Sequence, residues 1–248
     1  MIDRVQKVLE WMAPELESYK KRRIFSQKQI QKIVENRRRF ENKLQRSSKK
    51  LLDFLTYIDS EKNLEKIRNK KIAALGTGLE DTDMLLQANI IKIYERALHY
   101  YSEPILLKDF SEYCIRRKAF EEMKSTFAAK CLKNLTNTDL WVYCAQKLWE
   151  IDDIEGARGL FIKGASVNSD SKLCVEFFRL ECLYANKLNR INQELGVADE
   201  DKDEIEKGKI ALTVFENLKE RMAEHEINQC MEISSIVSGL NEQLQKLI

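Results

Sequence analysis

The chain has 248 residues, of which 44% are hydrophobic and 33% are charged, and it contains only 8 Gly and 2 Pro. This composition excludes an intrinsically disordered tail, because enough apolar side chains are present to bury a core. It favours an all-α fold, because helix formers dominate and turn residues are scarce. The net charge of +2 conceals an asymmetry, since residues 1–72 carry 20 Lys plus Arg against 10 Asp plus Glu and the remainder carries 22 against 30. Such a chain is suited to two kinds of partner, although a solvated helix face explains the basic residues equally well.

The N-terminus lacks an apolar signal core, and no window holds the roughly 18 apolar residues of a membrane span. We therefore expect a soluble intracellular protein with no membrane contact. The cysteines never stand in a Cys-x-x-Cys pair, and only His99 and His225 are available to complete a metal site. We expect no metal, and buried free thiols in a reducing compartment, at Cys114, Cys131, Cys144, Cys174, Cys182 and Cys230.

Residues 1–50 predict two or three amphipathic helices. Pro14 suits a first helical turn or a break between helices, and Ser26 offers an N-cap with Gln29 three residues later. This segment shows no repeat signature. We expect it to be a separate domain, a basic helical arm that docks on a partner.

Residues 51–248 contain a repeated pattern of two interleaved series. Leu107, Trp141 and Cys174 form the first series, at intervals of 34 and 33. An aromatic residue of the second series stands 20 residues after Leu107, and another stands 20 residues after Trp141. Two antiparallel helices joined by a short turn fit this offset, which predicts an α-solenoid of about four helix pairs. Extra residues interrupt the pattern near 67–88 and near 186–206.

The residues that recur in these series predict the packed interior of the repeats. Aromatic rings at helical spacing could also stack on nucleic-acid bases, but an inter-repeat core is the better interpretation. Small residues such as Gly164 in the second helices favour close approach of neighbouring helices. The predicted core residues are Phe54, Tyr57, Tyr94, Phe110, Phe127, Trp141, Phe161 and Phe177.

The sequence offers little from which to build an active site. Gly76-Thr77-Gly78 is not followed by a Lys that could meet a phosphate, and no histidine stands near a plausible nucleophile. We therefore expect no catalytic residue and no cofactor.

Basic clusters near the N-terminus are the candidate binding residues. They could neutralise phosphates, serve as a nuclear import address or meet an acidic protein segment. Because no aromatic residues are interleaved with them, we favour a protein partner over direct RNA binding. The candidates are Lys20, Lys21, Arg22, Arg23, Arg37, Arg38, Arg39, Lys49 and Lys50.

The repeat resembles the half-a-tetratricopeptide (HAT) repeat, in which an aromatic residue is followed by another after three residues and by a Glu after seven. Phe54, Tyr57 and Glu61 show this pattern, while Leu107 replaces the usual Trp and Leu148 replaces the Glu. HAT arrays scaffold protein subunits in RNA-processing complexes.

A more extensive resemblance is carried by segments in order along the chain, among them Pro14-Glu15-Leu16-Glu17, Ala157-Arg158-Gly159-Leu160-Phe161 and Phe177-Phe178-Arg179-Leu180-Glu181. These segments resemble the U three small nucleolar RNA-associated protein six family, HAT-repeat subunits of the small-subunit processome. The resemblance implies a nucleolar scaffold in a subcomplex of WD-repeat β-propeller proteins on a pre-ribosomal, U three small nucleolar RNA particle. It also implies further repeats beyond Ile248 in longer members. The alternatives are a HAT scaffold from splicing or mRNA 3′-end processing, and a protein that binds pre-rRNA directly through its basic N-terminus.

Overall fold

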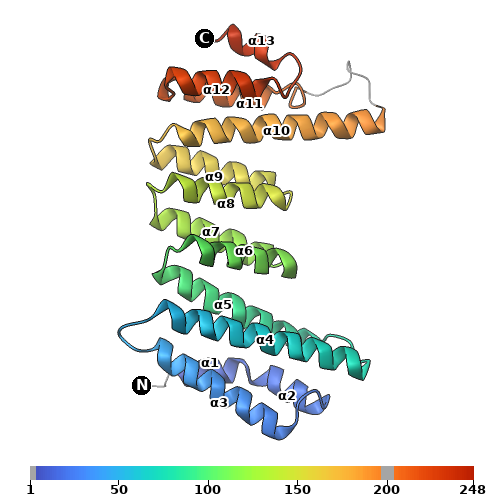
Figure 1. Cartoon of the computed structure of the whole chain (residues 1–248). Helices are drawn as coiled ribbons and strands as arrows, with labels where there is room; N and C mark the ends of the chain where they lie inside the picture. The colour runs from blue at the N-terminus through green and yellow to red at the C-terminus, as the bar shows by residue number, and fades with distance from the viewer. Residues whose placement is uncertain (1–3, 197–203) are drawn as a thin grey trace. The chain divides into compact units, whose positions relative to one another are not determined.

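A computed structural model describes residues 4–196 and 204–248, and its regular elements are helices throughout these ranges (Figure 1). The predicted all-α fold is confirmed. The chain divides into two units, residues 1–123 and residues 124–248. None of the described helices is long and apolar enough to cross a membrane.

The first unit begins with three helices, as the sequence predicts: α1 (Arg4–Trp11), α2 (Ala13–Lys21) and α3 (Gln27–Leu44). Pro14 lies in the first turn of α2, where its missing N–H removes no helical hydrogen bond. Ser26 caps α3, since its hydroxyl accepts a hydrogen bond from the Gln29 N–H at 3.3 Å and its own N–H donates to the Gln29 side chain at 3.0 Å. This capping box fixes the start of α3.

The rest of the first unit contains α4 (Leu51–Leu75), the 3₁₀ turn η1 (Asp81–Asp83), α5 (Met84–Tyr100) and α6 (Pro104–Arg117). The α4 helix packs against α5, and α5 packs against α6. Gly76 ends α4 in the left-handed conformation at φ 64°, which glycine adopts without a steric penalty. The extra residues predicted near 67–88 are thus a long end of α4, a loop and the start of α5.

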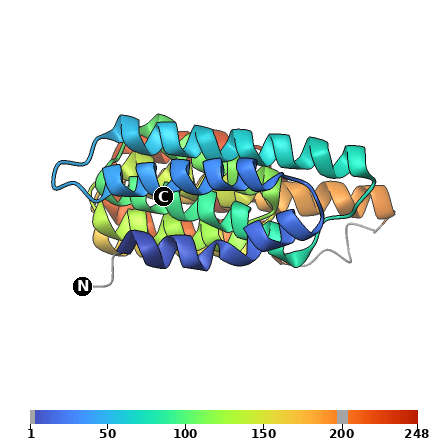
Figure 2. The same ribbon diagram turned by 90° about the horizontal axis from the view of Figure 1, so that it is seen from below.

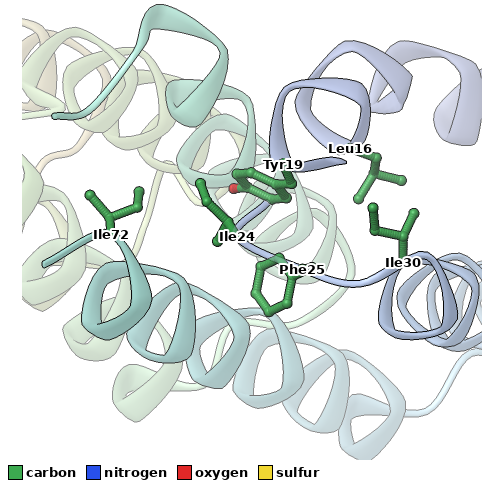
Figure 3. Packing of buried hydrophobic residues seen from close by; sticks show 6 residues of the cluster. All are labelled: Leu16, Tyr19, Ile24, Phe25, Ile30 and Ile72. Atoms are coloured by element: carbon green, nitrogen blue, oxygen red, sulfur yellow. The ribbon is translucent and has the colours of Figure 1, made fainter. Parts of the chain in front are cut away.

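An apolar cluster joins α2, α3 and the segment between them to the far end of α4 (Figure 3). Figures 1 and 2 show α3 lying beside α4, and the two helices are in contact. The cluster stabilises the N-terminal helices against α4 by burying apolar side chains. Its buried members are Leu16, Tyr19, Ile24, Phe25, Ile30 and Ile72.

The boundary between the units falls within α7 (Phe120–Lys133). The second unit continues with α8 (Thr138–Glu150), α9 (Ile154–Val167), α10 (Lys172–Leu195), α11 (Lys209–Leu218), the 3₁₀ turn η3 (Lys219–Arg221), α12 (Glu224–Ser234) and α13 (Leu240–Gln245). In this unit α8 packs against α9, and α10 contacts α9, α11 and α12. Most of the acidic run in the predicted 186–206 insertion lies outside the described residues.

Trp141 anchors the core of the second unit with only 1% of its surface exposed. Its indole N–H donates to the Leu135 carbonyl at 3.2 Å, so the buried ring leaves no unpaired donor. A Cβ built on Gly164 would lie 3.1 Å from the Trp141 ring, which shows that α8 and α9 approach closely because Gly164 has no side chain. Close approach at this small residue is confirmed.

The residues of the first predicted series lie on α4, α6, α8 and α10, and those of the second lie on α5, α7, α9 and α11. All eight predicted core residues are buried. Phe161 and Phe177 stack at 5.5 Å between ring centroids, and Tyr94 packs on Phe110 at 5.6 Å. The predicted boundary at residue 50 between a docking arm and a solenoid stays a prediction.

Candidate polyanion-binding surface

One face of α3 is exposed and basic, and it continues just past the C-terminal end of the helix. Helical periodicity places Ile30, Phe40 and Leu44 on the buried side, so charged residues at complementary positions point outward. The face carries one acidic side chain, Glu35, and five basic ones. An excess of one charge on a continuous surface attracts ligands of opposite charge. The exposed basic residues are Lys28, Lys32, Arg38, Arg39 and Arg46.

The basic residues at the end of α2 are not all exposed. Lys20, Lys21 and Arg23 are exposed, as expected for binding residues. The Arg22 side chain turns inward instead, and its guanidinium donates to Asp83 Oδ1 at 2.6 Å and to the Ser18 hydroxyl at 3.0 Å. Arg22 therefore fixes η1 against α2 and is not available to a partner.

Arg37 is the clearest correction to the predicted site, because only 1% of its surface is exposed. Its guanidinium donates to Glu61 on α4, with Nη2–Oε2 at 2.8 Å, and to Glu15 on α2, with Nη1–Oε2 at 3.2 Å. Asn89 on α5 donates to the same Glu61 carboxylate at 3.2 Å. The prediction that Arg37 binds a partner is wrong, since the residue joins three other helices inside the first unit.

Neighbouring carboxylates favour the charged form of the Arg37 guanidinium. Burial alone would lower the pKa of Arg37, but the Glu61 and Glu15 carboxylates outweigh it and raise that pKa above its ordinary value. Burial raises the pKa of Glu15, and the nearby Arg37 guanidinium opposes this shift. The sequence did hold a signal for burial, since Arg37 follows Ile30 by seven residues and precedes Phe40 by three, on the apolar side of α3.

Lys49 lies in a cavity of about 220 Å³ where α3 ends and α4 begins. Arg4, Arg96 and Tyr100 line the same cavity, although these three residues stand far from Lys49 in the sequence. The Lys49 Nζ lies 5.0 Å from the centre of the Tyr100 ring, so an aromatic side chain does accompany this basic residue. Folding thus gives Lys49 an aromatic neighbour that is not interleaved with the basic residues in the sequence. Lys50 is exposed directly before α4.

All six cysteines are free and buried, as predicted. Burial raises the pKa of Cys114, Cys182 and Cys230 to about 12 in each case. Within the described ranges, no three His, Cys, Asp or Glu residues gather as metal ligands. The thiols act as small apolar side chains in the core.

Part of the chain matches a known protein family. Residues 9–93 match the sequence profile of the family described as U3 small nucleolar RNA-associated protein 6. The matched segment includes the Arg37 network from Glu15 to Asn89.

Curated relatives extend the similarity along the chain. U3 small nucleolar RNA-associated protein 6 of Schizosaccharomyces pombe is 32% identical over 193 residues, which cover 76% of this chain and 40% of the relative. The human homolog of that name is 25% identical over 230 residues, covering 88% of this chain and 38% of the relative, and the mouse homolog gives the same figures. The chain thus spans about two fifths of the length of these relatives. The resemblance predicted from the sequence is confirmed: the chain is similar to the U3 small nucleolar RNA-associated protein 6 family.

Proposed function

We propose that this chain is a non-catalytic scaffold subunit of the U3 small nucleolar ribonucleoprotein within the small-subunit processome. In this role it supports pre-rRNA processing and small ribosomal subunit biogenesis in the nucleolus. The family match over residues 9–93 carries the proposal, because the names of the matched relatives tie them to the U3 small nucleolar RNA. The HAT-like alternation of helices adds support, since such arrays present broad binding surfaces.

The proposed protein partners are WD-repeat β-propeller subunits of the same subcomplex. A surface that carries an excess of one charge attracts a partner surface of opposite charge. This complementarity raises the rate of association and restricts the choice of partner. The exposed face of α3, with five basic side chains and one acidic one, provides such a surface.

A second candidate function is direct binding of pre-rRNA through the N-terminal helices. Its specific support is the cavity at Lys49, where cationic side chains and an exposed aromatic ring lie together. This role is compatible with scaffolding, because a subunit can hold protein and RNA at once.

Affinity purification of the tagged chain from cells tests the proposal. We expect U3 RNA, pre-rRNA and propeller subunits to be recovered, and depletion of the protein to reduce mature small-subunit rRNA. Recovery of splicing or mRNA 3′-end factors without U3 RNA would contradict it.

A variant pair locates the docking face in the same experiment. Arg38→Glu with Arg39→Glu reverses two charges on the exposed face of α3, and Lys66→Glu with Lys70→Glu makes the matched change on exposed residues of α4. Loss of the propeller subunits with the first pair alone would place their contact on α3. Equal recovery with both pairs would remove α3 from the interface.

A further inference from the structure

We propose that the cavity at Lys49 binds a phosphate of single-stranded RNA. Three cationic side chains, Arg4, Lys49 and Arg96, line the cavity together with the ring of Tyr100. Leu44, Gln45 and Phe54 complete its wall. The cavity draws on four helices, since Arg4 begins α1, Leu44 ends α3, Phe54 lies in the first turn of α4, and Arg96 and Tyr100 lie in the last turns of α5.

The cavity holds a surplus of positive charge. Arg96 is neutralised by Glu41, with which it forms two hydrogen bonds of 2.8 and 3.0 Å. Asp53, next to Phe54 in the chain, lies 3.5 Å from the Lys43 ammonium. Arg4 and Lys49 have no ion-pair partner in the parts of the chain that the structure describes, so two cations remain for an incoming anion. Each additional neutralised phosphate strengthens binding through release of counterions.

The size of the cavity limits what it can hold. Its 220 Å³ lies below the roughly 300–1,000 Å³ of typical pockets for whole small molecules. The cavity therefore suits one anionic group of a larger ligand that continues along the surface. The basic face of α3 provides such a path, because Arg46, Arg39 and Lys32 follow one another at seven-residue intervals, about 10 Å apart along a helix.

The aromatic ring favours RNA over an acidic peptide. Tyr100 is 53% exposed, and Lys49 covers one side of its ring. When the Lys49 ammonium turns toward a phosphate, the Tyr100 ring is freed for a base to stack upon it. An acidic peptide would use the cations but would gain nothing from the ring. Arg4, Arg96 and Tyr100 come from three separate helical turns, which explains why their grouping was not evident in the sequence.

The inference rests on the proposed function only for the source of the RNA, so the test uses the purified full chain without other subunits. Binding of a short, fluorescein-labelled oligouridine is followed by fluorescence anisotropy between about 50 and 200 mM salt. Arg4→Gln with Lys49→Gln should weaken binding and lower the slope of log affinity against log salt by about 0.7, because the cavity neutralises one phosphate of the single strand. Lys66→Gln with Lys70→Gln, which removes the same charge from exposed positions on α4, should leave the slope unchanged.

A second pair of variants tests the ring. Tyr100→Leu should weaken binding about tenfold with an unchanged salt slope, because loss of one stacked base removes no phosphate contact. Tyr100→Phe should bind as the unchanged chain does. Thermal melting of each variant verifies that the first unit stays folded.

Two results would overturn the inference, and a third would separate it from the proposed function. If Arg4→Gln with Lys49→Gln changed the slope no more than the control pair at Lys66 and Lys70, the binding would be only general attraction to the basic unit. A polyglutamate peptide that binds the cavity in place of the oligouridine, with Tyr100→Leu unaffected, would identify an acidic protein instead. Failure to recover U3 RNA from cells, with oligouridine binding intact, would contradict the proposed function and leave the RNA site standing.

Discussion

The two units of the chain stabilise their interiors in different ways. In the first unit a buried guanidinium, Arg37, bonds to carboxylates on two other helices. In the second unit Trp141 packs on a glycine, and Phe161 stacks on Phe177. The comparison teaches that in the first unit a buried ion-pair network adds to the apolar packing of the N-terminal helices on α4, whereas close fit between helices is the main feature around Trp141.

The charged contacts carry a particular energetic consequence. A buried ion pair adds little net stability over apolar residues of similar volume, but removal of one partner leaves a buried charge uncompensated. The Arg37 network therefore acts chiefly by specifying where α2, α3, α4 and α5 meet. An apolar core such as that around Trp141 loses stability in proportion to the volume removed.

The largest expected effect follows from loss of the Arg37 charge. Arg37→Ala should reduce the free energy of unfolding by about 3–5 kcal/mol, because Glu15 and Glu61 would remain buried without their partner. Urea denaturation measures the change. Arg38→Ala, the exposed neighbour, is the control and should stay within about 0.5 kcal/mol of the unchanged chain.

A triple replacement sharpens the same point. Glu15→Leu, Arg37→Met and Glu61→Leu together should be far less destabilising than Arg37→Ala alone, because no charge is left unpaired. If the triple variant proved as unstable as the single one, the lost volume of Arg37 rather than its charge would explain the effect.

Trp141→Ala should produce a loss of similar size, about 3–5 kcal/mol, through the cavity that it leaves in the second unit. Tryptophan fluorescence and urea denaturation follow the change. A shift below about 1 kcal/mol would show that the ring is dispensable to the core, and Trp141 would become a candidate binding residue.

Most of the second unit's core could be predicted from the sequence, whereas much of the first unit's binding surface could not. Recurrence at intervals of 33 and 34 identified Trp141 and Phe161, because a repeat imposes the same packing at each step. Arg37 was misassigned because a run of basic residues was treated as one surface, although a helix turns adjacent side chains in different directions. Tyr100 was missed because it meets Lys49 only after α4 and α5 fold back.

A smaller effect concerns two glycines on the same helix, α9. Gly159→Ala should stabilise the chain by about 0.5–1 kcal/mol, because its Cβ would meet nothing within 4 Å and alanine favours a helix. Gly164→Ala should lose that gain and be about 1–3 kcal/mol less stable than Gly159→Ala, because its Cβ would press on Trp141 at 3.1 Å. Equal stability of the two variants would mean that α8 can move away from α9 without cost.

The smallest effect arises from the buried thiol of Cys182. Burial, with smaller contributions from the neighbouring Cys230 and Glu181, raises its pKa from 9.0 to about 12. The folded chain therefore holds the proton more tightly than the unfolded chain, so the contribution to stability is complete below pH 9 and is lost as the pH rises toward 12. Between pH 8 and pH 10 this thiol should lower the free energy of unfolding by about 1 kcal/mol. Cys182→Ala removes this pH-dependent contribution of the thiol, while tyrosines and other groups that titrate in the same range remain in both proteins. The stability difference between the two proteins should hence shrink by about 1 kcal/mol over this range, and a difference that stayed constant would show that the thiolate is accommodated within the fold.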